Sequence, residues 1–312
     1  MLESPPMRLV VLMTLLLLTA CENSPDRHTP KRERPTGEEN EALFRKIGLE
    51  FETGKGDEIN ALLADACKNA KLAASVARLM MFHMKDAAQR QRDKQANRFQ
   101  FRDLESNFRY TRARSALGTM GPVAVPTVID ELMKNRFTDN RQIGVQILAS
   151  MSKDVLPMLK QAVIDSKPTF RHNYVAAVAG MKPSPERELM LLDWSKNDDY
   201  LVRSGAFVGL QRAGDRHLAL LRDAVARDPD TFVQKQVVKV LGGFTDRVTA
   251  ATVIAYYARC EKRGDRMGAS EAERTLVKIS KKPPTRRGRL IHYGLSYWRK
   301  WVLTLPVDGG NR

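Results

Sequence analysis

The strongest constraint on the fold is a repeat of about 31 residues that runs from Met120 to Phe244. Four segments align within it, and they are marked by Arg141, Arg171, Arg203 and Gln234. Three and seven positions after each marker stand two columns of mostly apolar residues: Gly144 and Leu148, Tyr174 and Val178, Ala206 and Leu210, Val237 and Leu241. A fixed period of this size indicates stacked supersecondary units. We therefore expect Leu148, Val178, Leu210 and Leu241 to occupy equivalent interior positions.

Each unit is predicted to contain two helices and a turn. Glycine ends one helix at Gly121, and Pro126 suits the first turn of the next, where its missing N–H is not needed. Helix N-cap aspartates follow in the turns, at Asp139, Asp199 and Asp230. We predict an all-α fold, an α-solenoid over residues 100–280 that follows a helical cap over residues 42–99.

The array is harder to follow after Phe244. The column is continued by Ala272 and Leu276 in one alignment. Matching Arg266–Ala269 to Arg203–Ala206 would instead place Glu273 on the leucine column. We favour the first alignment because it keeps a carboxylate out of the core.

These motifs resemble the HEAT-like repeat family, in its short form of about thirty residues. The matching residues are the Gly-Pro-x-Ala-Val-Pro entry at Gly121–Pro126 and the acidic turn followed by Val-Arg and small residues at Asp198–Ala206. The resemblance covers about half of the chain and implies a superhelical α-fold with an extended surface. Tetratricopeptide and ankyrin signatures are absent.

The N-terminus has the pattern of an export signal. Arg8 precedes an apolar run from Leu9 to Ala20, which is shorter than the roughly twenty residues that a spanning helix needs. The run ends in Leu-Thr-Ala-Cys, which resembles the lipobox of bacterial lipoproteins and implies that Cys21 carries acyl chains. An ordinary secretory signal or a buried N-terminal helix is the alternative.

Residues 1–20 are therefore predicted to be a signal peptide, and residues 21–41 to be a disordered tether without an aliphatic or aromatic residue after Cys21. Glu22 stands where an aspartate would imply inner-membrane retention in many bacteria. The expected location is the cell envelope, lipid-anchored at the outer membrane and facing the periplasm.

The net charge of +16 favours acidic partners. The expected partner is another protein or an acidic envelope polymer. Nucleic acid is not expected for an exported chain. The candidate partner-binding residues form a basic ladder: Arg141, Arg171, His172, Arg203, Lys235 and Lys239. The HEAT resemblance implies a second role, in which each arginine pairs with a turn aspartate of a neighbouring unit, and we favour that role for the arginines.

Two other segments are basic. Residues 85–114 interleave cations with Phe99, Phe101, Phe108 and Tyr110, which suits either stacking on nucleic acid or, as we favour, a helix whose aromatic residues face the core. Residues 281–312 combine cations with Trp298 and Trp301. This segment is predicted either to cap the last repeat, the reading that we favour, or to lie on anionic lipid.

No catalytic, cofactor or metal-binding motif is recognisable. The five histidines lack HExxH spacing, and no nucleophile elbow or phosphate-binding loop is present. Cys67 and Cys260 are expected to be buried free thiols, with a single disulfide as the alternative. The function predicted from the sequence is a membrane-tethered protein-binding scaffold that is not an enzyme. An enzyme or enzyme accessory of envelope metabolism is the alternative.

Overall fold

The structure is a computed structural model that describes residues 37–53, 56–96, 104–135, 138–281, 285–286, 289–290 and 293–306. Across these ranges the chain is helical apart from one short hairpin, in which β1 (Thr285–Arg286) pairs antiparallel with β2 (Arg289–Leu290). The predicted all-α class is therefore confirmed. None of the helices in these ranges has the length and apolar character that crossing a bilayer demands.

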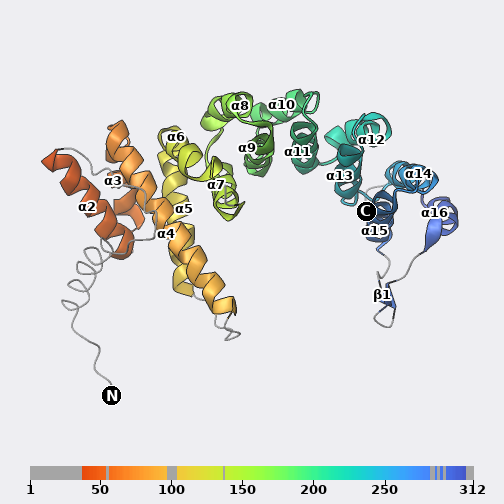
Figure 1. Cartoon of the computed structure of the whole chain (residues 1–312), viewed down its shortest axis with the longest axis horizontal. Coiled ribbons are helices and arrows are strands. Elements are labelled where there is room, and N and C mark those ends of the chain that lie inside the picture. Colours follow the sequence, from red (N-terminus) through yellow and green to blue (C-terminus); the bar gives the residue numbers. More distant parts are fainter. Residues whose placement is uncertain are drawn as a thin grey trace, which may run out of the picture.

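The N-terminal end of the molecule is built from four helices (Figure 1). They are α2 (Glu38–Thr53), α3 (Gly56–Ala66), α4 (Ala70–Ala96) and α5 (Leu104–Met120). Leu43, Phe44, Ile47 and Phe51 share one face at helical spacing in the sequence, and Ile47 and Phe51 are the buried residues of α2. Helices α4 and α5 pack along each other, and their far ends project below α6 and α7 in Figure 1.

Three expectations for this region need correction. Helix α2 begins at Glu38, so the predicted tether is shorter at its C-terminal end, and the acids of the first turn of α2 suit the positive end of the helix dipole. The sequence favours Asp57 as the N-cap of the second helix, but Asp57 lies inside α3 and does not precede it. Phe108 is 60% exposed on α5 and does not face the core, whereas Phe99 and Phe101 lie outside the described residues.

The rest of the chain alternates between two layers. Its elements are η2 (Gly121–Ala124), α6 (Val125–Val128), the π-helix η3 (Ile129–Met133), α7 (Thr138–Ser150), η4 (Lys153–Val155), α8 (Leu156–Asp165), α9 (Pro168–Gly180), α10 (Pro185–Trp194), α11 (Tyr200–Leu210), η5 (Gln211–His217), α12 (Leu218–Arg227), α13 (Thr231–Leu241), α14 (Arg247–Arg263) and α15 (Arg266–Ser280).

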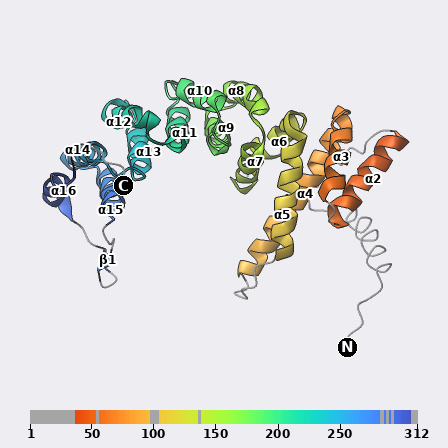
Figure 2. The same ribbon diagram turned by 180° about the vertical axis from the view of Figure 1, so that it is seen from behind.

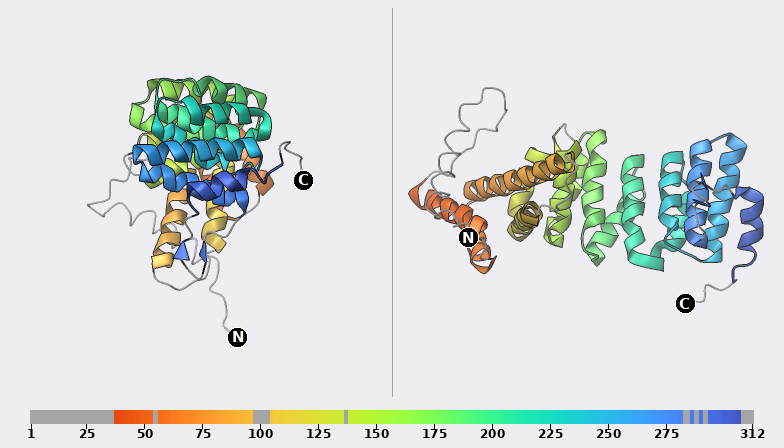
Figure 3. Two further views of the ribbon diagram at one scale, coloured as in Figure 1. Left: turned by 90° about the vertical axis from the view of Figure 1, so that its right-hand side faces the viewer. Right: turned by 90° about the horizontal axis from the view of Figure 1, so that it is seen from below.

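Helices α7, α9, α11, α13 and α15 each pack against the next in this order, and we call them the inner layer. Helices α8, α10, α12 and α14 cover α9, α11, α13 and α15 respectively, and we call them the outer layer. The two layers follow an arch with the inner layer on its concave side, and the reverse view in Figure 2 shows the same order. Figure 3 shows the inner helices side by side from below.

The core lies between the layers and contains the columns predicted from the repeat. Leu148, Val178, Leu210 and Leu241 each have 0% exposure, and they occupy matching positions on α7, α9, α11 and α13. On α15 the matching positions are Ala272 and Leu276, both also at 0%, which agrees with the alignment that we favoured.

The inner helices approach each other closely where side chains are small. A Cβ atom added to Gly205 on α11 would come within 2.6 Å of Val175 Cγ1 on α9. No real carbon atoms tolerate that distance, so the α9–α11 spacing requires glycine at this position.

The C-terminal end is closed by α16 (Gly294–Val302), which packs on α14. Trp298 has 0% exposure and contacts the rings of Tyr293, Tyr297 and Trp301. The Tyr293 backbone N–H donates to Glu273 Oε1 at 2.6 Å, which ties the segment to α15.

Candidate partner-binding surface

The arginine that marks the repeat connects the turns of neighbouring units, most clearly at Arg203. Arg203 Nε and Nη2 donate to the two carboxylate oxygens of Asp228 at 2.9 and 3.0 Å, and Nη1 donates to the carbonyl oxygens of Asn197 and Asp198. Only 11% of the Arg203 side chain and 5% of the Asp228 side chain are exposed. The hydrogen bonds to Asp228 raise the pKa of Arg203 against the effect of burial.

The other markers make weaker versions of this contact. Arg171 Nη1 lies 3.3 Å from Asp199 Oδ2, and Arg141 donates to the carbonyl of Asn135 and to Thr138. Gln234 donates to the carbonyl of Asp228 at 2.6 Å. Hydrogen bonds and ion pairs within the protein thus engage these side chains, so they do not form a ladder of cations facing solvent.

The acid that pairs with Arg203 is Asp228, whereas the sequence analysis named Asp230. Asp230 is the N-cap of α13 and accepts from the Phe232 N–H, just as Asp199 caps α11 and accepts from Leu201. Asp139 lies within α7 and is not its N-cap. Sequence reasoning found the acidic turns but did not separate the capping acid from the pairing acid.

The other predicted partner-binding residues, His172, Lys235 and Lys239, do not take part in these contacts between turns. His172 is exposed on α9, and its pKa is lowered by partial burial of the ring and then by the charge of Arg141. Lys239 is exposed on α13, and Lys235 Nζ lies 6.0 Å from the centre of the Phe232 ring. Among the described residues, neither lysine pairs with an acid. The two lysines are therefore the part of the predicted set that lies toward solvent without an ion pair.

The inner layer presents one exposed stripe per helix on its concave side. On α13 this stripe contains Phe232, Lys235, Gln236 and Lys239, at helical spacing. On α15 the matching residues are Met267, Ser270, Glu271 and Arg274. On α11 Val208 is exposed, Leu201 is partly buried, and Gly205 lies at the contact with α9.

Charge differs between the two layers. Helices α9, α11 and α13 contain no acidic residue. Helices α8, α10 and α12 of the outer layer each contain acids, as in Glu186, Glu188 and Asp193 of α10. These three inner helices therefore carry no negative charge, although α14 of the outer layer, with four cations and one acid, is also basic.

Sequence reasoning missed one buried cation, Arg187 on α10. Its guanidinium, with 2% of the residue exposed, donates to the carbonyls of Val178, Ala179 and Gly209 at 2.9, 2.7 and 3.0 Å. These carbonyls end α9 and α11, where the helix dipole is negative. Burial lowers the pKa of Arg187, and the charge of Arg212 lowers it further.

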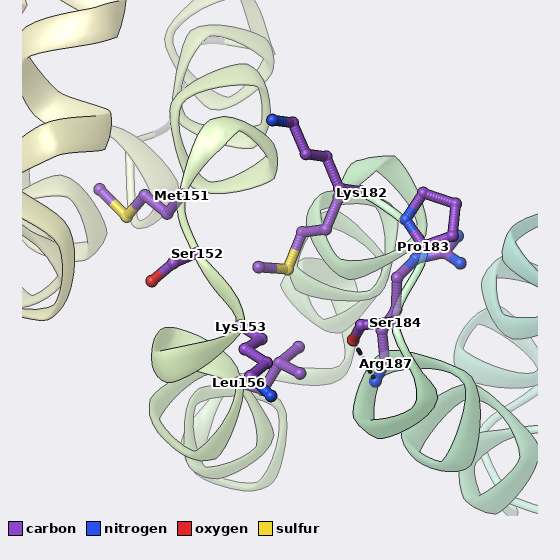
Figure 4. Close-up of a pocket in the computed structure, with 9 residues that line it drawn as sticks. Met151, Ser152, Lys153, Leu156, Lys182, Pro183, Ser184 and Arg187 are labelled. Carbon is purple, nitrogen blue, oxygen red and sulfur yellow. Dashed lines mark hydrogen bonds between the residues drawn. The ribbon is translucent and has the colours of Figure 1, made fainter.

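A cavity of about 200 Å³ lies beside Arg187, between the turn after α7 and the turn after α9 (Figure 4). Met151, Leu156, Met181 and Pro183 give it a mostly apolar lining. Its Lys153 pairs with Glu186 at 2.5 Å. With Lys153 and Arg187 both engaged, the cavity does not bring together groups for acid–base or nucleophilic chemistry.

The remaining predicted sites are quickly placed. Cys67 and Cys260 are free thiols; Cys67 follows α3 at the N-terminal end, and Cys260 is in α14 toward the other end. Within the described part of the chain, no group of three or more His, Cys, Asp or Glu residues could hold a metal ion. Cys21, the predicted lipidation site, lies outside the described residues. No family model, curated protein or solved structure matches the chain.

Proposed function

We propose that this protein is a lipid-anchored scaffold of the bacterial cell envelope that binds another protein through the concave face of a HEAT-like α-solenoid. The observation that carries the proposal is the register of the inner layer. Five successive inner helices place equivalent residues in the core, so their exposed stripes also fall in register. Extended concave surfaces of this kind are what solenoids use for binding.

The anchor is supported by the sequence of residues 9–21 alone. Acyl chains on Cys21 would hold the protein by apolar burial of about 0.8 kcal/mol per methylene. Between Cys21 and Gly37 lie residues that extend by at most about 3.6 Å each, so the folded part would stay within roughly 60 Å of the bilayer surface. A partner would then be held close to the membrane.

The anchor is tested by fractionation and mass analysis of the N-terminus. A mature chain that begins at an acylated Cys21 in the membrane fraction is expected. An unprocessed chain in the cytoplasmic fraction would refute the anchor and the envelope location together.

The binding surface is tested by site-specific photo-crosslinking in cells. Val208, Phe232 and Met267 are exposed apolar positions of the inner layer, and Ile164, Leu189 and Val248 are matched positions of the outer layer. A photoreactive phenylalanine analogue at each position should yield a reproducible adduct from the inner set only. Equal yields from both sets, or no adduct, would contradict a scaffold that uses its concave face.

A further inference from the structure

The exposed residues of α11, α13 and α15 form two parallel rows. The first row is apolar and lies at the N-terminal ends of these helices: Tyr200, Phe232 and Met267, which are 42%, 37% and 72% exposed. The Tyr200 and Phe232 rings meet edge to face with centroids 5.6 Å apart. This contact makes the row continuous between α11 and α13.

The second row is cationic and lies further along α13 and α15, without a member on α11. Lys239 on α13 and Arg274 on α15 are both exposed, and they follow Phe232 and Met267 by the same seven residues. Lys278 adds a third cation. Its side chain lies against the end of α13, because a Cβ atom added to Gly242 would come within 3.1 Å of Lys278 Cδ. Glu271 is the one acid on the α11, α13 and α15 stripes, and its carboxylate lies 3.6 Å from Arg274.

The spacing of the rows constrains what can lie across them. Seven residues of helix rise by about 10 Å, which is close to the diameter of an α-helix with its side chains. Three neighbouring helices, at about 8–10 Å between axes, span roughly 20 Å, the length of about 14 helical residues.

We propose that the surface formed by Tyr200, Phe232, Met267, Lys239, Arg274 and Lys278 binds an acidic amphipathic helix of a partner protein. The apolar stripe of that helix packs on the first row, and its carboxylates face the second row. This assignment rests on the proposed scaffold function and names the class of segment that the scaffold holds.

The apolar row favours a polypeptide over another polyanion. The apolar surface of side chains such as Phe232 and Met267 is removed from water only if the bound ligand is itself apolar along one edge. A sulfated polysaccharide or a nucleic acid backbone would contact the cationic row and leave the apolar row uncovered. Charge alone gives attraction without selection among polyanions.

The test uses the mature chain from residue 21 with Cys21→Ser, which cannot be acylated. The probe is a fluorescein-labelled synthetic 18-residue peptide with Leu and Phe on one helical face and Glu on the other. A scrambled isomer of the same composition, polyglutamate and dextran sulfate serve as comparison ligands, and binding is followed by fluorescence anisotropy. The amphipathic peptide is expected to bind at least tenfold more tightly than its scrambled isomer.

Two pairs of variants locate the binding site. Lys239→Gln with Arg274→Gln should weaken peptide binding at least fivefold, whereas Lys262→Gln with Arg263→Gln, exposed cations at the end of α14, should change it less than twofold. Tyr200→Ala with Phe232→Ala should remove the preference over the scrambled isomer, and Leu189→Ala with Val248→Ala should not. Far-UV circular dichroism confirms that each variant is folded.

Three results would overturn the assignment. One is equal affinity for the scrambled isomer. Another is dextran sulfate binding that matches the peptide and ignores the aromatic substitutions. The last is an equal loss from the α14 control. If crosslinking in cells maps a partner to another part of the inner layer while the peptide fails, the scaffold stands and only the assigned segment falls.

Discussion

Replacing the repeat-marking arginine by alanine at three equivalent positions should cost very different amounts of stability. Arg203 makes a two-point contact with a carboxylate whose side chain is 5% exposed. Removing one partner of a buried ion pair costs about 3–5 kcal/mol, because the other charge is left unpaired. Asp228 keeps one hydrogen bond, from the Asp230 N–H at 2.9 Å, so we expect about 3 kcal/mol for Arg203→Ala.

The other two positions should be milder for reasons visible in their contacts. Arg171 makes one contact with Asp199 at 3.3 Å and is 30% exposed, so solvent screening limits the cost of Arg171→Ala to about 1 kcal/mol. Arg141 hydrogen-bonds a carbonyl and a threonine hydroxyl and lies 5.5 Å from the centre of the Phe170 ring, and Arg141→Ala should cost about 1–2 kcal/mol.

The measurement combines urea unfolding with hydrogen exchange, because repeat arrays can lose a few units while others stay folded. Faster exchange should centre on α11 to α13 for Arg203→Ala. In an Asp228→Asn background the same substitution should cost about 1–2 kcal/mol less, as expected for two coupled partners. If all three alanine variants cost the same, or if Arg203→Ala is silent, the arginines do not hold the turns and the argument fails.

Three further outcomes follow from single contacts. Burial alone would raise the pKa of Asp246, but hydrogen bonds from Thr249 and Arg222 lower it below the unfolded value near 3.8. The carboxylate therefore contributes its full stability above the unfolded pKa and loses it as pH falls through the lowered pKa. The stability difference between wild type and Asp246→Asn, from urea curves at pH 3 to 7, should shrink at the acid end. Arg187→Met should lose about 3 kcal/mol and speed exchange at the ends of α9 and α11, and an unchanged urea midpoint would contradict the three-carbonyl contact. Trp298→Ala should lose about 3–5 kcal/mol locally and release α16 from α14, seen as new protease cleavage there, whereas an uncleaved variant would show that capping does not depend on this ring.

The interior was predictable because the period and the apolar pattern determine it together. Val178 and Leu210 are buried for the same reason, since each stands seven residues after a marker on an inner helix. The capping aspartates were also readable, because Asp199 and Asp230 directly precede the helices that they cap.

The polar contacts across units could not be read in the same way. Asp228 and Asp230 are alternatives of equal chemistry, and only the path of the turn decides which carboxylate meets Arg203. Arg187 occupies no repeat position, and its three acceptors come from the ends of two helices that packing brings together. The exposure of Phe108 was also not readable. An aromatic residue at helical spacing does not reveal whether another element covers it, and Phe108 is exposed.

The charge of the inner layer is the feature that folding leaves unexplained. Some cations of the chain are compensated at helical spacing, as in Lys134 with Asp130 and Arg227 with Asp223. An acid at Gln236 would stand three residues before Lys239, and such a pair would stabilise α13 by about 0.2–0.5 kcal/mol. Helix α13 has no acid that would offset the repulsion between its two lysines. An acidic partner on the concave face would offset this charge, which is why we propose that binding occurs there.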